Sequence, residues 1–150
     1  MTRSPMFVDS HAHLDCADFD QDRSAVIERA QAAGVTRILA IGSGTGPGTL
    51  DCANKLAEAF ECLDASIGIH PHEAALATED DFGLLKQLSE HSVVIAWGEI
   101  GLDFHYDHSP REVQIEVFAR QLKLASERRL PVIIHTREAE KETLTVLQQH

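Results

Sequence analysis

The sequence predicts an α/β domain in which strands and helices alternate along the chain. Five short apolar runs recur within 150 residues, and segments with helical periodicity separate them. Alternation of this kind joins parallel strands through right-handed helical crossovers. Two architectures satisfy it: an open doubly wound sheet and a (β/α)8 barrel of the TIM type. Periodicity alone does not choose between them.

Each apolar run has the composition of a strand that is buried on both faces of a parallel sheet. The runs cover residues 6–8, 37–41, 65–69, 93–97 and 131–134. Residues 26–33 repeat apolar side chains at helical spacing up to Gly34, and a second such segment follows the acidic residues 79–81. Acidic side chains favour the amino end of a helix, so we predict helices in both places.

The clearest helical pattern begins at Ser109. Pro110 lies in its first turn, and Glu112 follows Ser109 at the spacing of a capping box. The apolar periodicity continues from there to Arg128. We therefore predict a long helix that begins at a Ser109 cap and leads into the last apolar run.

The glycines do not form the phosphate loop of a doubly wound nucleotide-binding sheet. Such a loop would follow the first strand, where the chain instead has Asp-Ser-His-Ala-His at residues 9–13. Residues 42–48, after the second strand, are rich in glycine but lack the lysine of a P-loop. We interpret them as a flexible loop at the mouth of a site.

Composition restricts the class of function. The chain carries 24 acidic and 13 basic residues, a net charge of −11, which argues against binding nucleic acid by bulk electrostatics. Chemistry at a phosphate would then need local positive charge, such as a bound metal. No apolar stretch approaches the ~20 residues of a membrane span, and the polar first residues leave no room for a signal peptide. Three cysteines without a C-x-x-C pair predict reduced thiols and a cytoplasmic protein.

Polar side chains gather where the predicted strands end, which is where α/β folds keep their active sites. The pairs after the first, third, fourth and fifth strands are His11 and His13, His70 and His72, Glu99 and Asp103, and His135 and Arg137. The other four histidines have no such placement, and we expect His91, His105, His108 and His150 on the surface.

His11 and His13 lie two residues apart beside an apolar strand. Residues at this spacing point to the same side of an extended chain, roughly 6 to 7 Å apart, so both imidazoles can bind one cation. Asp9 is available as an outer partner of these rings. An isolated His-x-His pair more often has a structural role. The prediction of a cation site therefore depends on the position of this pair directly after a strand.

Glu99 ends a run that is otherwise apolar enough to be buried, and a buried carboxylate needs compensation. Two cations bridged by its oxygens would supply it. The alternative is an ion pair with an arginine from a neighbouring strand, such as Arg137. His135 follows the fifth strand, and taken alone it has the ordinary interpretation of a satisfied core histidine.

His70 and His72 flank Pro71, which directs the chain out of the third strand. We expect them to contact substrate rather than metal, because His11, His13, Glu99 and His135 already supply much of a two-metal site. His70 would hold an anionic oxygen. Asp103 either orients a ligand or water, or caps the turn that follows it.

Four segments taken together resemble the TatD family of metal-dependent deoxyribonucleases in the amidohydrolase superfamily. They are FVDSHAHL at residues 7–14, GIHPH at 68–72, GEIGLD at 98–103 and IHTR at 134–137. The resemblance implies a TIM-type (β/α)8 barrel with a two-metal site. A full barrel takes about 250 residues, so the chain is expected to be a single domain, residues 1–150, carrying about the first five βα units.

The resemblance also implies roles for the site residues. His11 and His13 would bind the first metal, Glu99 would bridge, and His135 would bind the second. Apart from the resemblance, we predict from the residues themselves that Glu99 and His70 are catalytic and that His70, His72, Asp103 and Arg137 contact substrate. Two further ligands of the family, a His and an Asp after later strands, have no counterpart here, and Phe104 and Glu138 replace a frequent Tyr and Asp.

The implied activity is hydrolysis of DNA phosphodiesters from a 3′ end by a metal-activated water. Two divalent ions would serve, with Zn, Mn, Ni or Mg all compatible with mixed imidazole and carboxylate ligands. One alternative is a metal-dependent amidohydrolase acting on a small amide or lactone. Another is a catalytically incomplete fragment that associates with itself through unpaired strand edges.

Overall fold

The computed structural model describes residues 6–43, 46 and 48–150. Its centre is a parallel sheet of five strands in the order β1-β2-β3-β4-β5, so each strand pairs with its neighbour in sequence. The strands are β1 (Phe7–Ala12), β2 (Val35–Ala40), β3 (Leu63–Ile67), β4 (Val94–Asp103) and β5 (Val132–Arg137). A doubly wound sheet reverses its strand order, and this one does not. The barrel-type alternative is therefore confirmed.

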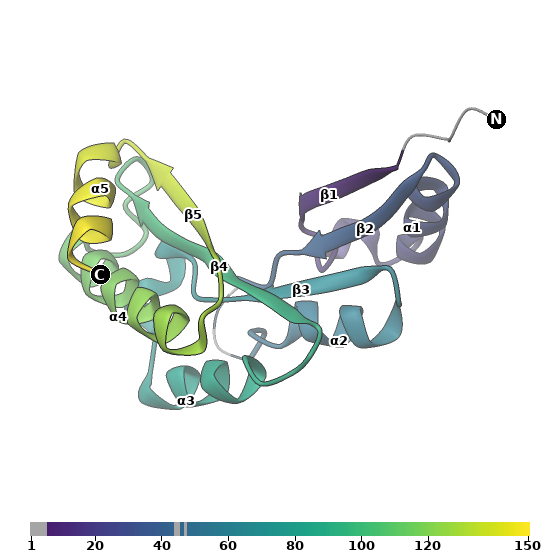
Figure 1. Cartoon of the computed structure of the whole chain (residues 1–150). Coiled ribbons are helices and arrows are strands. Elements are labelled where there is room, and N and C mark those ends of the chain that lie inside the picture. Colours follow the sequence, from purple (N-terminus) through teal and green to yellow (C-terminus); the bar gives the residue numbers. More distant parts are fainter. Residues whose placement is uncertain (1–5, 44–45, 47) are drawn as a thin grey trace.

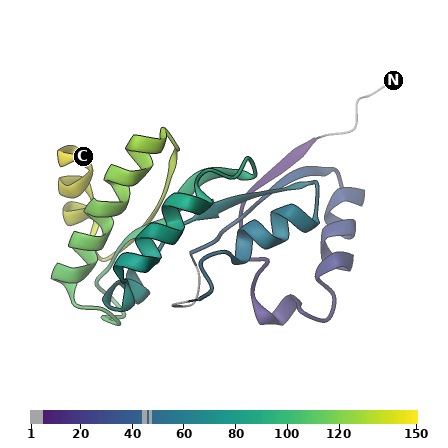
Figure 2. The ribbon, with the colours of Figure 1, turned by 90° about the horizontal axis from the view of Figure 1, so that it is seen from below.

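The sheet curls from β1 to β5, and helices cover its outer face (Figures 1 and 2). The helices are α1 (Arg23–Ala32), α2 (Cys52–Ala59), α3 (Glu79–Leu88), α4 (Arg111–Arg128) and α5 (Glu140–Gln149), with 3-10 turns η1 (Ala17–Phe19) and η2 (Pro71–Leu76). The core fills the layer between them, where Trp97, Phe118 and Leu85 are fully buried. None of the helices in the described residues is long and apolar enough to cross a membrane.

β4 is twice as long as its apolar run suggested, because glycines let its second half lie against β5. At Gly101 the backbone has φ +149°, and a Cβ there would overlap the carbonyl oxygen of His135. The register pairs Gly101 with His135 and Asp103 with Arg137. Glu99 and His135 thus lie inside neighbouring strands rather than after them.

The expectation that every strand is buried on both faces is wrong for β1 and β5. Phe7 and Val8 are 53% and 67% exposed, and Val132 at the start of β5 is 37% exposed. Both strands lie at the edges of the five-stranded sheet, where each has a neighbour on one side only.

The helix starts are only partly as expected. The acidic start at residues 79–81 is confirmed, and Thr78 and Asp81 form a capping box there. The capping box at Ser109 is wrong: Pro110 occupies the N-cap position of α4. The buried Ser109 hydroxyl instead donates to the His72 carbonyl and accepts from the Ala75 backbone N–H. It therefore ties η2 to the start of α4.

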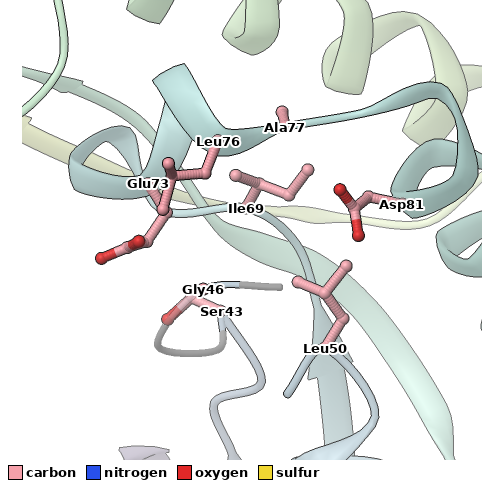
Figure 3. A pocket seen from close by; sticks show the side chains of 8 residues that line it. All are labelled: Ser43, Gly46, Leu50, Ile69, Glu73, Leu76, Ala77 and Asp81. Atoms are coloured by element: carbon pink, nitrogen blue, oxygen red, sulfur yellow. The ribbon is translucent and has the colours of Figure 1, made fainter. Parts of the chain in front are cut away.

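Of the glycine-rich segment at residues 42–48, residues 44, 45 and 47 lie outside the described residues. Ser43 and Gly46 face Glu73 and Leu76 of η2 across a narrow crevice (Figure 3). Between the described residues its volume of about 10 Å³ admits at most one water molecule.

Candidate metal centre

Two clusters of potential metal ligands lie toward the carboxyl-terminal ends of the strands. One contains His11, His13 and Glu99, and the other contains His70, His72 and His135. Within each cluster the ligand atoms lie within 4.8 Å of one another. The side chains come from β1, β4, β5 and the segment after β3, so residues far apart in sequence converge as expected.

In the first cluster, the imidazoles of His11, in β1, and His13, just after it, point at one place. His11 Nε2 and His13 Nε2 are 3.2 Å apart. Glu99 Oε2 lies 3.5 Å from His11 Nε2 and 3.7 Å from His13 Nε2. The backbone N–H of His11 donates to Asp9 Oδ1, so Asp9 contacts the main chain here and not an imidazole nitrogen.

Glu99 joins the two clusters. Its other oxygen, Oε1, lies 3.0 Å from His135 Nδ1, which is also 3.2 Å from His70 Nε2. The alternative of an ion pair between Glu99 and Arg137 is wrong, because the Arg137 guanidinium lies over the Tyr106 ring, 5.0 Å from its centroid. Hydrogen bonding to His135 lowers the pKa of Glu99 and, in turn, raises that of His135.

Asp103, at the end of β4, organises the second cluster. Its Oδ2 accepts hydrogen bonds from His72 Nε2 at 2.8 Å and His135 Nε2 at 3.0 Å. Its Oδ1 accepts from the backbone N–H groups of His105 and Tyr106, both at 3.0 Å. Asp103 therefore both orients candidate ligands and caps the following turn, the two roles that the sequence left as alternatives.

Asp103 is fully buried as a carboxylate among donors. Burial acts to raise its pKa, but hydrogen bonds from Tyr106, His72, His135 and His105 outweigh burial and hold the pKa well below its usual range. The carboxyl is therefore ionised at neutral pH. The ionised Asp103 accepts a hydrogen bond from His135 Nε2–H, and Nδ1 of the same ring faces Glu99.

His70 has the opposite arrangement of protons. The backbone N–H of His72 donates to His70 Nδ1 at 3.2 Å, which leaves the ring proton on Nε2. Burial, together with the neighbouring His135 and His72, lowers the pKa of His70 to about 4. His70 is thus a neutral ring whose Nε2–H points into the site.

The donor sets suit divalent cations. Zinc binds imidazole nitrogen at about 2.0–2.1 Å and carboxylate oxygen at about 2.0–2.2 Å, so two donors roughly 3 Å apart can reach one ion. The pairs His11 with His13, at 3.2 Å, and Glu99 with His135, at 3.0 Å, both meet that requirement. The contact between Asp103 and His135 is the carboxylate–histidine support typical of metal ligands.

Two buried glutamines of α4 position the strand ends, and the sequence reasoning missed both. Gln114 accepts from the Asp103 N–H at 2.8 Å and donates to the carbonyls of Asp103 and Ser109. Gln121 accepts from the Ile69 N–H and donates to the Ile69 carbonyl. Their spacing of seven residues within an apolar helical stripe was the available signal.

The four remaining histidines, which all lie in the described part of the chain, are exposed as expected. His91 pairs with Glu58 away from the clusters. His105 pairs with Glu138, and the His108 ring lies 4.7 Å from the His72 ring, so both border the site. A hollow of about 660 Å³ opens beside the clusters, lined by His13, Asp15, Cys16, Ala17, Ser43, Thr49, Cys52, His70, His72 and Glu73.

Comparison with known proteins identifies the family of this chain. The sequence model of the family of TatD related DNases matches residues 8–150. The chain belongs to the TatD family. A solved TatD homologue from Escherichia coli K12, YJJV, superposes with a TM-score of 0.87 at 34% identity, over 96% of this chain and 56% of that one. The five βα units therefore have the arrangement of a partial TIM-type barrel.

The TatD relatives carry two kinds of name. YabD of Bacillus subtilis, named a metal-dependent hydrolase, is 43% identical over 96% of this chain and 56% of its own length. The protein of Cronobacter sakazakii named 3'-5' ssDNA/RNA exonuclease TatD is 36% identical over 90% of this chain and 51% of its own. The chain thus spans about half the length of the relatives it matches.

Proposed function

We propose that the protein is a divalent-metal-dependent hydrolase that cleaves phosphodiester bonds of single-stranded nucleic acid from the 3′ end. The observation that carries the proposal is Glu99, whose two oxygens face His11 and His13 on one side and His135 on the other. Membership of the TatD family and the exonuclease names of its relatives support the choice of reaction and substrate.

The ligand assignment follows the donors. His11, His13 and Glu99 would hold one divalent ion, and Glu99 with His135 would hold the second. When bound, such ions lower the pKa of a water molecule and neutralise charge on a phosphate. Asp103 keeps the Nε2 proton of His135 in place, so that Nδ1 faces the ion.

The protein's own donors would bind the substrate. His70 presents Nε2–H toward the site while Nδ1 is used by the His72 backbone, so it suits a phosphate oxygen better than a metal ion. His72 donates a hydrogen bond from Nε2–H to Asp103, and its ring lines the hollow beside the clusters. Arg137, at the end of β5, supplies a positive charge at the rim. These local donors are needed because the chain as a whole is acidic.

The test is an assay on single strands labelled at the 3′ or the 5′ end, with metal analysis of the same sample. We expect early release of 3′-labelled mononucleotide, a ladder from the 5′-labelled strand, and loss of both with EDTA. Mn, Ni, Zn or Mg added back in turn would identify the ion. The same assay on RNA strands tests whether the protein cleaves DNA, RNA or both. A panel of amides and lactones tests the alternative of an amidohydrolase.

No metal-dependent release from either strand would overturn the proposal, and turnover of an amide alone would replace it. The odd number of cysteines supports a reducing, cytoplasmic location. Separating soluble, membrane and periplasmic fractions of producing cells tests that expectation.

A further inference from the structure

A cluster of flat and cationic side chains lies beside the metal centre and has no part in it. It consists of Tyr106, His105 and His108 from the segment after β4 and Arg137 at the end of β5, and we refer to it as the Tyr106 surface. Tyr106 is 50% exposed. Together with Glu138, three of these residues line a hollow of about 340 Å³: His105, Tyr106 and Arg137.

The rings of the Tyr106 surface already stack on one another. The Tyr106 and His108 rings are nearly parallel, with an interplanar angle of 13° and centroids 5.8 Å apart. The His105 ring meets Tyr106 edge-on at 4.7 Å, and the Arg137 guanidinium lies over it at 5.0 Å. An aromatic ring flanked in this way offers both a flat apolar face and positive charge.

Arg137 is available to a ligand. Most other arginines of this acidic protein have carboxylate partners: Arg23, Arg29, Arg37, Arg120 and Arg128. Within the described part of the chain, the Arg137 guanidinium has none. Glu138, the acidic residue nearest in sequence, pairs with His105 at 2.8 Å. A free guanidinium beside an exposed tyrosine suits a ligand that combines a flat ring with an anion.

The surface is held at a defined place relative to the metal centre. Asp103 accepts the backbone N–H groups of His105 and Tyr106 with one oxygen and the imidazoles of His72 and His135 with the other. The Tyr106 ring also lies 5.6 Å from the His72 ring. A ligand stacked on Tyr106 would therefore reach His72 and the metal clusters within the length of one nucleotide.

We propose that the Tyr106 surface binds an unpaired nucleobase of the substrate, with Arg137 contacting a phosphate of the same strand. This inference rests on the proposed function. Single strands expose base faces that stack on aromatic side chains, and a duplex hides those faces. The surface would therefore select unstacked, single-stranded ends over paired ones, with little preference among the bases.

The first test does not depend on activity. The chain has one tyrosine, so 3-fluorotyrosine gives a single fluorine resonance that reports on Tyr106 alone. In EDTA, which prevents cleavage, a short oligothymidylate should shift this resonance. An abasic strand of equal length should bind about tenfold more weakly, since it keeps the phosphates and lacks the bases. Equal shifts from the two strands, or no shift from either, would overturn the inference.

The second test uses kinetics with Mn or Mg present. Tyr106→Ala should raise KM for single strands about tenfold with little change in kcat, and Tyr106→Phe should restore the KM because it keeps the ring. His91→Ala removes an exposed ring elsewhere and serves as the control. Tyr106→Ala should not raise KM for abasic substrate.

The outcomes separate the two proposals. Metal-dependent cleavage with an unchanged KM in Tyr106→Ala would refute the Tyr106 surface and leave the hydrolase intact. A base-dependent fluorine shift without cleavage by the wild-type chain would support the surface and refute the hydrolase.

Discussion

Asp103 and Glu99 are carboxylates only four residues apart in β4, yet their surroundings give them different tasks. Asp103 is fully buried, and its oxygens accept hydrogen bonds from His72, after β3, and from the backbone of His105, after β4. The Glu99 side chain keeps 13% of its surface exposed and faces imidazole nitrogens of both clusters. Asp103 thus has a structural role as a hydrogen-bond acceptor, and the oxygens of Glu99 are positioned to bind an ion.

Replacing Glu99 tests this division directly. Glu99→Ala should remove the bridge between the clusters and lower metal affinity and cleavage at least about 100-fold, while circular dichroism and the urea midpoint change little. His91→Ala, at an exposed imidazole, is the matched control and should keep both properties. Equal losses from the two substitutions would mean general destabilisation and would refute the ligand assignment.

Cys52 provides a second prediction for a single residue. Burial and the adjacent Asp15 carboxylate raise the pKa of its thiol from 9.0 to about 12. Only the thiolate reacts, so at about pH 8 Cys52 should alkylate about a thousandfold more slowly than an ordinary thiol. The exposed Cys16 should react first in iodoacetamide labelling followed by mass spectrometry.

Asp15→Asn should partly restore the reactivity of Cys52, because it removes the negative charge beside the thiol while leaving the burial in place. Labelling of Cys52 as fast as Cys16 in the wild-type chain would contradict the expected pKa.

Among the elements, α4 has a role beyond covering the sheet. Its buried face contains not only apolar side chains but also Gln114 and Gln121, which bind the backbone at the end of β4 and just after β3. Strand ends next to a site have backbone groups without a neighbour in the ladder, and burial makes such groups costly. The two amides satisfy them and so hold the segments that carry His70 and Asp103.

Gln114→Ala should therefore destabilise the protein more than its size suggests. It leaves the buried N–H and carbonyl of Asp103 without partners, and we expect a loss of about 2–3 kcal/mol in free energy of unfolding. Gln87→Ala makes the same change at an exposed helical position of α3 and should stay within about 0.5 kcal/mol of wild type. Urea denaturation followed by Trp97 fluorescence measures both, and equal effects would contradict the positioning role of Gln114.

At the scale of the whole structure, β1 and β5 lie at the two edges of the curled sheet, and each has a neighbour on one side only. Phe7 and Val8 of β1 and Val132 of β5 are apolar and accessible. Unpaired strand edges with apolar side chains tend to recruit another chain. The architecture that brings the two ligand clusters together therefore also leaves surface that favours association.

A polypeptide of residues 1–150 alone should self-associate through these edges. Sedimentation velocity over a range of concentrations should show dimers or larger species. Val8→Lys should shift the chain toward monomer by placing a charge on the β1 edge. Leu144→Lys, which changes an exposed apolar side chain of α5, should not. A wild-type chain that stays monomeric throughout would refute the expectation.

Local sequence patterns determined much of this protein. Apolar runs and helical periodicity predicted the alternating elements, because they reflect backbone preferences and burial within a few residues. The polar pairs beside the strands predicted which side chains converge, because parallel strands end on one side of a sheet. The His-x-His pair at the end of β1 needed only the geometry of an extended chain to point at a single place.

Tertiary structure alone decided which partners these side chains have. Glu99 faces imidazoles and not Arg137, because the β4–β5 register places His135 beside Gly101 and leaves Arg137 over Tyr106. Ser109 ties η2 to α4 instead of capping a helix, since packing brings the carbonyl of His72 within its reach. Such contacts join residues tens of positions apart, and their geometry depends on sheet curvature and helix packing, which no local pattern of residues contains.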